Sequence, residues 1–296
     1  MFDPSQLAAL VAVHRRGSFD LAAAELGVTQ SAVSQRLRAL EERVGTLLIQ
    51  RGAPSVATEA GMRLIRHHDE VALLARGVEQ DLGGDISGPV TLRIAVNADS
   101  LATWVLAALA EVPGVLFDLV IDDQDVSQDW LRRGEVAAAV TSHAGPLQGC
   151  DTVALGALRY RATASPGYMA RWFADGVTKA AVAQAPALTF SDKDRLQVAW
   201  VQARGLTSPA AFPSHRMASS QAFVDACLLG LGWGMNPDAL VADHLAAGRL
   251  AELVPGTALD VPLYWQFARL TGELTRPLTR AVRAAAARVL VPPAGM

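Results

Sequence analysis

The sequence predicts a mixed architecture, in which a small helical domain is followed by a long helix and then by a larger α/β domain. Three patterns carry this prediction: two amphipathic segments meet at Gly27, a long amphipathic helix starts at Thr58, and strands alternate with helices from Val90 onward. A chain of 296 residues is long enough for about two domains. The expected divisions are a first domain over 1–57, a linker helix over 58–84, a hinge over 85–89 and an α/β domain over 90–296.

The first domain is expected to begin with a helix over Pro4–Arg16. A second helix follows Ser18, a good N-cap, and ends at Gly27, because glycine readily adopts the left-handed conformation of a helix C-cap. Its apolar side is expected to consist of Leu21, Ala22, Ala24 and Leu26. A third helix, capped by Thr29, is expected to bury Val33, Leu37, Leu40 and Val44. Such a pair is typical of a helix-turn-helix, although similar pairs are often only structural hairpins.

The third helix carries short or planar hydrogen-bonding side chains on the face opposite its apolar stripe, and such groups suit base edges and phosphates in a major groove. The residues expected to contact DNA there are Thr29, Gln30, Ser31, Ser34, Gln35 and Arg38. Two short strands, over Leu47–Gln50 and Ser55–Ala57, then form a hairpin or wing. Arg51 at its tip is placed to reach a phosphate, and its alternative role is that of a solvated loop residue.

The charge of the chain argues against general coating of nucleic acid, since its net value is −3. The stretch from Thr29 to Arg51 is nevertheless locally basic, with four arginines against two glutamates. This excess is modest for a single copy. Dimerisation would double the phosphate contacts and steepen the dependence of binding on salt.

The helix expected from Thr58 to Leu82 has little core of its own, so pairing with a second copy is the natural way to bury its apolar stripe. That stripe consists of Met62, Ile65, Val71, Leu74, Val78 and Leu82. The segment His67-His68-Asp69-Glu70 invites a metal interpretation. Successive helical residues point about 100° apart, however, and cannot converge on one ion.

From Val90 onward strands and helices alternate, which predicts a parallel sheet whose loops meet in a crevice at the carboxyl ends of the strands. In the first half the expected strands are 90–96, 117–121 and 135–141, and the expected helices are about 101–112 and 127–133. In the second half the expected strands are 158–165, 187–190, 215–218, one within 231–237, and 262–270, and the expected helices are 167–173, 220–230 and 275–289. Crevices of this kind bind small molecules.

The loops of this crevice carry groups for both an anion and a cation. Asp99 or Ser100 can cap the next helix, whose free N–H groups would attract a carboxylate. The loop after the second strand is acidic, with Asp122, Asp123 and Asp125, and hydroxyls lie at the end of the third strand, on Thr141 and Ser142. An anion site and a cation site in one crevice would suit a basic amino acid, which carries a carboxylate and a cationic side chain. Alternatively, Asp99 is only a cap and the acidic run a solvated turn.

The segment T-Q-S-A-V-S-Q-R-L-R-A-L-E, preceded by G-S-F-D-L-A-A-A-E-L-G and followed by L-L-I-Q-R, resembles the DNA-binding end of LysR-type transcriptional regulators. The resemblance implies a winged helix-turn-helix, an antiparallel dimer linker and a two-lobed effector domain like that of periplasmic binding proteins. Lobe I would span about 90–161 and 269–296, lobe II about 162–268, and the strands would cross near Tyr160–Thr163 and Phe267–Leu270.

Four further segments, I-A-V-N-A-D-S-L-A-T-W, L-R-R-G-E-V-A-A-A-V-T, G-L-G-W-G-M-N-P and P-L-Y-W-Q, are similar to the ArgP/LysG branch of that family. The branch senses lysine and arginine and activates a gene for a basic-amino-acid exporter. This resemblance implies that Ser100 and Thr141 lie near the carboxylate of the effector and Asp123 near its side-chain cation. From the chemistry of the loops, Asp99 and Ser142 are expected at the same site. Trp233, together with Trp104 and Trp265, could wall the pocket or belong to the core. The acidic loop reads I-D-D-Q-D rather than the L-E-D-E type, which leaves open which carboxylate points inward.

We therefore expect a DNA-binding transcriptional regulator, with no catalytic residues, no metal and no cofactor besides its effector. The expected partners are double-stranded DNA, an amino-acid effector, a second copy in a homodimer or homotetramer, and RNA polymerase. Charged residues make up 19% of the chain and no signal peptide is evident, so a cytoplasmic protein without membrane spans is expected. The alternatives are a LysR-type regulator of another small anionic metabolite, a solute-binding protein, and an α/β enzyme. A G-x-S-x-G elbow, a phosphate-binding glycine loop and metal-spaced His or Cys sets are all missing from the sequence, which disfavours the enzyme.

Overall fold

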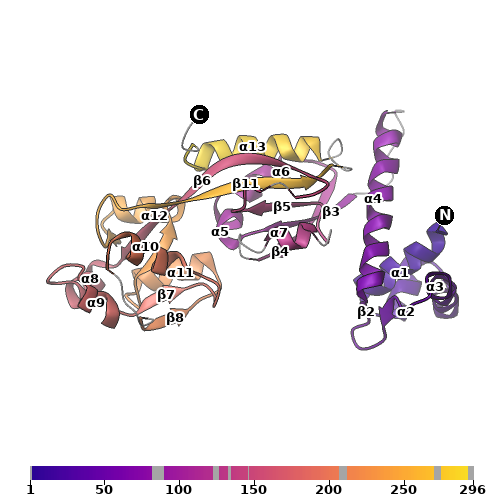
Figure 1. Cartoon of the computed structure of the whole chain (residues 1–296), viewed down its shortest axis with the longest axis horizontal. Helices are drawn as coiled ribbons and strands as arrows, with labels where there is room; N and C mark the ends of the chain where they lie inside the picture. Colours follow the sequence, from indigo (N-terminus) through magenta and orange to yellow (C-terminus); the bar gives the residue numbers. More distant parts are fainter. Residues whose placement is uncertain are drawn as a thin grey trace. The chain divides into compact units, whose positions relative to one another are not determined.

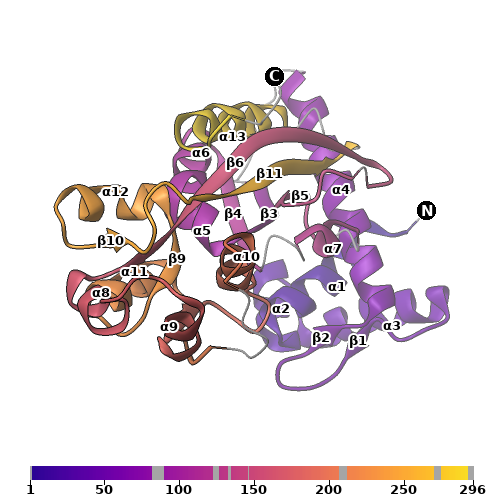
Figure 2. The same ribbon diagram turned by 60° about the vertical axis from the view of Figure 1, so that its left-hand side comes forward.

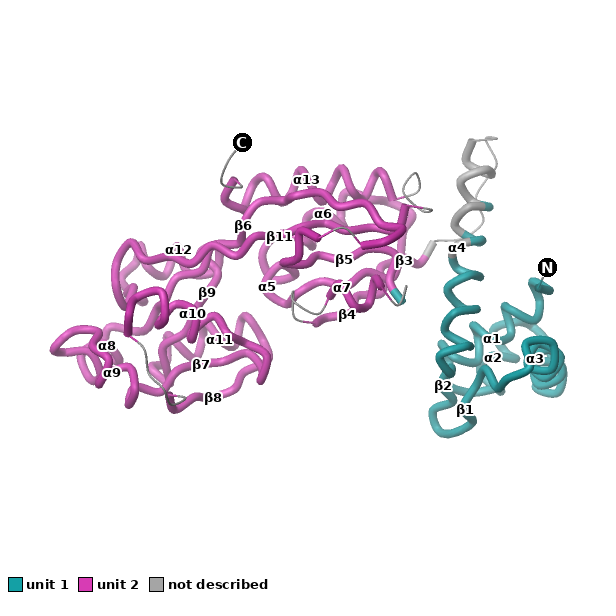
Figure 3. Tube along the Cα trace, in the orientation of Figure 1, with its two compact units in different colours: residues 1–90, 133–135, 270–274 teal, residues 91–132, 136–269, 275–296 magenta. Residues whose placement is uncertain are grey.

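The computed structural model describes residues 2–81, 90–122, 127–132, 135–145, 147–206, 212–269 and 275–292. The chain forms two compact units (Figure 3). The N-terminal unit comprises residues 1–90, 133–135 and 270–274, and the C-terminal unit comprises residues 91–132, 136–269 and 275–296. No helix in the described ranges combines the length and the apolar character that crossing a membrane requires.

The N-terminal unit consists of α1 (Pro4–Arg16), α2 (Phe19–Leu26), α3 (Gln30–Val44), β1 (Ile49–Gln50), β2 (Val56–Ala57) and α4 (Glu59–Asp81). Its caps are those that the sequence predicts. The Ser18 side chain accepts from the backbone of α2, Thr29 caps α3, and Gly27 has a φ of 64°. The expected apolar side of α2 is wrong at Leu21, which is 56% exposed, and at Ala24, which is also exposed, because α2 turns Ala22 and Ala23 to the core. The core gathers between α1, α2, α3 and the start of α4, and includes Leu7, Leu10, Val33, Leu37, Leu40, Leu48 and Ile65.

The hairpin of β1 and β2 is held tightly against the start of α4. Thr58 caps that helix, donating to the carbonyl of Leu47 at 2.8 Å and accepting from the amide of Gly61 at 3.1 Å. A Cβ on Gly61 would lie 2.1 Å from the carbonyl oxygen of Leu48, so this close approach requires glycine. From α1, the Nδ1 atom of His14 accepts a hydrogen bond from the amide of Ala57 at 3.2 Å. His14 therefore has a structural role in fixing the wing.

An ion pair joins α4 to α1. One nitrogen of Arg15, Nη2, lies 2.9 Å from each of the two carboxylate oxygens of Asp69. Of the predicted apolar stripe, Ile65 is buried and Val71 is 48% exposed. The side chains of Leu74 and Val78, and Leu82 as a whole, lie outside the described residues. An exposed Val71 is what a helix with an unpartnered stripe would present.

The C-terminal unit is built on a sheet whose described strands follow the order β10, β6, β11, β5, β3, β4, with β9 also pairing with β6. The strands are β3 (Val90–Val96), β4 (Val115–Ile121), β5 (Ala138–Thr141), β6 (Cys150–Ala164), β9 (Gly234–Pro237), β10 (Ala251–Glu252) and β11 (Leu259–Ala268). The strands β3 and β5 are parallel, whereas β11 runs antiparallel to both β5 and β6.

The long strands β6 and β11 pass through both lobes of this unit, as Figures 1 and 2 show. In lobe I, Tyr264–Phe267 of β11 pair with β5, and in lobe II, Tyr160–Thr163 of β6 pair with β9. The expected crossing at Phe267–Leu270 is therefore wrong, because Phe267 pairs with Ala138 inside lobe I. The second crossing lies near the start of β11, and the expected boundary at residue 268 moves to that point.

Helices cover both lobes. In lobe I, α5 (Ala98–Ser100), a π-helical turn (Leu101–Val105) and α6 (Leu106–Ala110) follow one another without a break; α6 and α13 (Arg276–Val289) lie on one face of the sheet and α7 (Ser127–Arg132) on the other (Figure 1). Lobe II contains α8 (Pro166–Trp172), α9 (Lys179–Gln184), α10 (Leu196–Ala203), α11 (Ser220–Leu228) and α12 (Asp238–Ala246), with the parallel pair β7 (Ala187–Thr189) and β8 (Ser214–Arg216).

Candidate nucleic-acid interface and ligand cleft

The polar residues of α3 form one exposed face. Gln30, Ser31, Gln35 and Arg38 are exposed and Ser34 is half-buried. Their spacing of one and four residues keeps them within one side of a helix. The Thr29 hydroxyl accepts from the amide of Ala32 at 3.2 Å and lies 3.0 Å from the Ser31 hydroxyl. Thr29 therefore fixes the start of the helix while its neighbours present donors and acceptors outward.

Arg51 lies exposed in the wing, and its guanidinium carbon is 5.1 Å from the centroid of the Phe19 ring. Phe19 is the first residue of α2, so this cation–π contact joins the wing to the helix-turn-helix. A guanidinium stacked by one face keeps its N–H edge available for an anion. The arrangement suits a phosphate contact beside the α3 face.

A cleft of about 580 Å³ lies within the C-terminal unit, where the two lobes meet. Lobe I contributes residues 97–99, 121 and 122, and the long strands contribute 160 and 259–262. Lobe II contributes residues 190–196, 199, 220, 223 and 235–237. Side chains from segments far apart in the sequence therefore share one cavity, of a size typical of small-ligand sites.

Asp99 joins three parts of the cleft. One carboxylate oxygen accepts from the hydroxyl of Tyr160 at 2.8 Å and the other from the hydroxyl of Ser220 at 2.6 Å. The first helix turn begins at Asn97 without a side-chain cap, so Asp99 is not the cap that the sequence suggested. Instead it links lobe I to a crossing strand and to the first residue of α11 in lobe II.

Asp122, at the end of β4, has a partner for each oxygen. Trp130 donates to Oδ2 from its indole Nε1 at 2.9 Å, and the ammonium of Lys193 lies 3.2 Å from Oδ1. Trp130 belongs to lobe I and Lys193 to lobe II. The Asp122 side chain is 21% exposed and that of Lys193 is 56% exposed, so this ion pair bridges the lobes at the rim of the cleft.

Carboxylates outnumber cations along the described cleft wall. Five aspartates line it, Asp99, Asp122, Asp192, Asp194 and Asp260, against Lys193 and Arg195. The loop carboxylates have local partners, since Asp192 pairs with Arg216 and Asp194 accepts from the amides of Phe190 and Leu196. The carboxylates placed to meet a ligand cation are therefore Asp99, which accepts from two neutral hydroxyls, and Asp122, whose ion pair with Lys193 lies at the rim.

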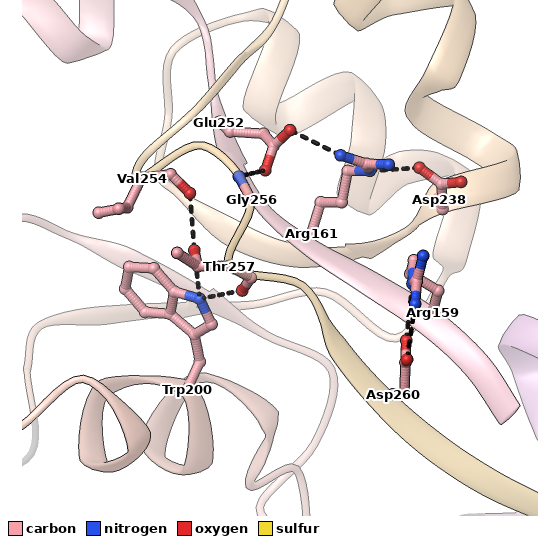
Figure 4. Close-up of polar contacts among 9 residues, drawn as sticks. All are labelled: Arg159, Arg161, Trp200, Asp238, Glu252, Val254, Gly256, Thr257 and Asp260. Carbon is pink, nitrogen blue, oxygen red and sulfur yellow. Dashed lines mark hydrogen bonds and ion pairs between the residues drawn. The ribbon is translucent and has the colours of Figure 1, made fainter. Parts of the chain in front are cut away.

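The long strands are held together on the lobe II side by charged pairs (Figure 4). Arg159 on β6 donates twice to Asp260 on β11, at 2.8 and 2.7 Å, and these bonds hold the pKa of the Asp260 carboxyl below its usual range. Arg161 bridges Asp238 and Glu252, so it joins β6 to α12 and β10. These pairs fix the floor of the cleft rather than offering charge to a ligand.

The other described residues that were expected at the effector site do not line the cleft. Ser100 is fully buried, Thr141 accepts from the amide of His143 at 3.2 Å, and the Ser142 hydroxyl lies 3.4 Å from Nδ1 of His143. Trp233 is buried against Trp200 and Phe212, with ring centroids 5.6 and 5.7 Å away, because lobe II uses it as core. Trp104 and Trp265 are likewise buried. Asp123 and Asp125 lie outside the described residues.

Three residues that make contacts in the cleft were not predicted from the sequence. Tyr160, Lys193 and Ser220 meet lobe I carboxylates that lie between 61 and 121 positions away along the chain. The first residue of α11, Ser220, could have been found as a helix-start hydroxyl facing the crevice. Within the described residues no group of His, Cys, Asp and Glu could hold a metal ion.

A helix-turn-helix with an outward polar face, joined to a two-lobed domain with a ligand cleft, defines a ligand-responsive transcriptional regulator. Residues 4–62 match the bacterial regulatory helix-turn-helix proteins of the lysR family, and residues 88–290 match the LysR substrate binding domain. The chain belongs to the LysR family of DNA-binding transcriptional regulators, which are not enzymes.

Its relatives include proteins named for the basic amino acids. The transcriptional regulator ArgP of Pseudomonas aeruginosa is 44% identical over 98% of both chains. The crystal structure of ArgP from Mycobacterium tuberculosis is 41% identical, covers 99% of this chain and all of its own, and superposes with a TM-score of 0.84. Full-length LysG from Corynebacterium glutamicum, with the effector Arg bound, is 36% identical over 98% of this chain and 100% of its own, with a TM-score of 0.72.

Proposed function

We propose that this regulator senses a basic amino acid, lysine or arginine, in the cleft between the lobes of its C-terminal unit. The observation that carries the proposal is the described cleft wall, on which Asp99 is held by the neutral hydroxyls of Tyr160 and Ser220, and Asp122 already binds the alkylammonium of Lys193. A cationic side chain gains from such a wall, whereas an anionic ligand is repelled by it. The similar LysG of C. glutamicum, whose structure holds bound Arg, supports the same ligand class.

Asp122 is our first candidate for the side-chain cation of the effector, because its Oδ1 atom already faces an ammonium across the cleft. Asp99 is the second, since both of its oxygens lie on the cleft wall between the lobes. Asp123 stays a candidate from the sequence. The α-carboxylate of the effector is expected near Arg195, which is exposed on the lobe II wall. Ser100 and Thr141, which the resemblance places near this carboxylate, do not line the cleft.

The DNA contacts that we propose are Thr29, Gln30, Ser31, Ser34, Gln35 and Arg38 on α3, with Arg51 of the wing on a phosphate. Two copies joined through α4 would place two such faces on one operator, as a homodimer or within a homotetramer. Effector binding then shifts the assembly between two states by its difference in affinity for them. The target that we propose is a basic-amino-acid exporter gene, and the regulated partner is RNA polymerase.

The competing candidate is a regulator that responds to a small anionic metabolite instead of a basic amino acid. Two cations on the lobe II wall, Lys193 and Arg195, favour this alternative. A thermal-shift screen of the purified protein against the twenty amino acids and a panel of small carboxylates separates the two. We expect stabilisation by lysine and arginine, and less by citrulline, which has the shape of arginine without its charge. Stabilisation by a dicarboxylate alone would overturn the proposal.

A further inference from the structure

Lys193 stands out chemically. The chain has 26 basic residues, and only Lys179 and Lys193 are lysines. Lys179 is exposed at the start of α9 and does not line the cleft. Lys193 lies on the cleft wall with its ammonium 3.2 Å from the carboxylate of Asp122. The alkylammonium that the cleft already holds is thus the same group that ends the side chain of a lysine ligand.

The loop around Lys193 is fixed by its own hydrogen bonds. The Ser191 hydroxyl accepts from the amide of Lys193 at 3.1 Å, and Asp194 accepts from the amides of Phe190 and Leu196 at 2.8 and 3.0 Å. Asp192 pairs with Arg216 on β8. With its neighbours engaged, the loop directs Lys193 to lobe I.

Asp122 is held ready by lobe I itself, because Trp130 donates to Oδ2 and leaves Oδ1 facing lobe II. An ion pair with a half-exposed ammonium is weak, since water and salt screen it. A ligand cation that enters the cleft can therefore take the place of Lys193 at this oxygen. Two cations cannot both hold it without repelling each other.

We propose that Lys193 is a tethered competitor of the effector: its ammonium occupies the position on Asp122 that the side-chain cation of a basic amino acid takes. This inference rests on the proposed function. In the empty protein Lys193 neutralises Asp122 and joins the lobes, and the effector must displace it. The residue thus raises the effector concentration at which the regulator responds.

Isothermal titration of L-arginine and L-lysine into the full-length wild type, Lys193→Met and Lys179→Met tests this directly. Methionine keeps most of the length of the side chain and removes its charge. We expect Lys193→Met to bind both ligands more tightly, by on the order of two- to fivefold, the change that corresponds to a weak ion pair. Lys179→Met should bind as the wild type does.

The outcomes separate this inference from the proposed function. If the wild type binds the ligands and Lys193→Met binds them equally or less tightly, Lys193 is not a competitor of the effector, and the proposed function still stands. If the wild type does not bind them, both the competitor role and the proposed function are overturned. A second readout uses reductive ¹³C-methylation, which preserves charge and gives separate NMR signals for the two lysines. Saturating arginine should shift the Lys193 signal and not that of Lys179; an unmoved Lys193 signal would contradict displacement.

Discussion

The carboxylate of Asp122 combines two contacts of different character. Its bond from the Trp130 indole is internal to lobe I, whereas its ion pair with Lys193 reaches across to lobe II. The first orients the group and the second depends on what fills the cleft. A ligand cation that binds Asp122 would change the ion pair between Asp122 and Lys193, and with it the contact between the lobes.

Replacing Asp122 with asparagine removes the charge and nearly preserves the shape. We expect the affinity for arginine and lysine to fall roughly 10- to 100-fold, the loss typical of a hydrogen bond to a charged group. Asp118→Asn is the matched control, since Asp118 lies on the same strand, pairs with Arg93 at 3.1 Å and does not line the cleft. Equal affinities of Asp122→Asn and wild type in isothermal titration would remove Asp122 from the site.

Cys227 offers a prediction for lobe II. Burial raises the pKa of this thiol to about 12, although Asn236 donates to its sulfur at 3.3 Å. In the unfolded chain the thiol ionises at a lower pH. The stability that it contributes is therefore fully present below the pKa of the unfolded thiol and is lost as the pH rises through the pKa of the folded thiol. Between about pH 8 and 11, the wild type should therefore lose stability relative to Cys227→Ala. Denaturant unfolding at several pH values measures this, and parallel pH profiles of the two proteins would refute it.

At the scale of elements, sequence patterns locate the pieces that carry their own signals. The helices α2 and α3 lie where predicted, because Ser18 and Thr29 cap them and Gly27 ends α2. By contrast, β6 was expected over 158–165 and runs from Cys150 to Ala164. Its first half pairs with β11 and its last residues with β9, and such distant pairing leaves no local trace.

Three helices and one strand were not predicted: α9, α10, α12 and β10. The N-cap residues of α10 and α12, Arg195 and Pro237, make no side-chain cap, and β10 has only two residues. The cleft followed the same rule. Of the acidic run after β4, the described residue Asp122 lines the cleft, whereas the partners Tyr160, Lys193 and Ser220 come from distant parts of the chain. Trp233 was considered as a wall of the ligand pocket, but it is buried in the core of lobe II.

The wing is the element whose role is most directly testable. We expect Arg51→Ala to weaken binding to specific and unrelated DNA alike, and to lower the slope of log K against log salt by about one for each protomer. Arg63→Ala is the control, because Arg63 is an exposed arginine of α4 that pairs with Glu59 at 2.7 Å. Fluorescence anisotropy at several salt concentrations gives both quantities. A loss confined to one DNA sequence would instead assign Arg51 to base reading.

In the whole molecule, the two regions proposed to bind DNA and effector carry opposite charge. The chain is acidic overall, with a net charge of −3, yet the stretch from Thr29 to Arg51 is basic and the cleft wall is acidic. A modest local excess of positive charge suits a DNA contact that needs two copies to hold. An acidic cleft suits a cationic signal.

The most direct test of this account is a footprint of the full-length protein on the DNA upstream of its own gene, with and without L-arginine or L-lysine. We expect a salt-sensitive protected region whose pattern changes as the amino acid is added, with half of the change at the concentration that half-saturates the cleft in isothermal titration. Citrulline should leave the pattern unchanged. A footprint that is identical with and without saturating arginine and lysine would contradict the central claim, that a basic amino acid in the cleft controls how this regulator binds DNA.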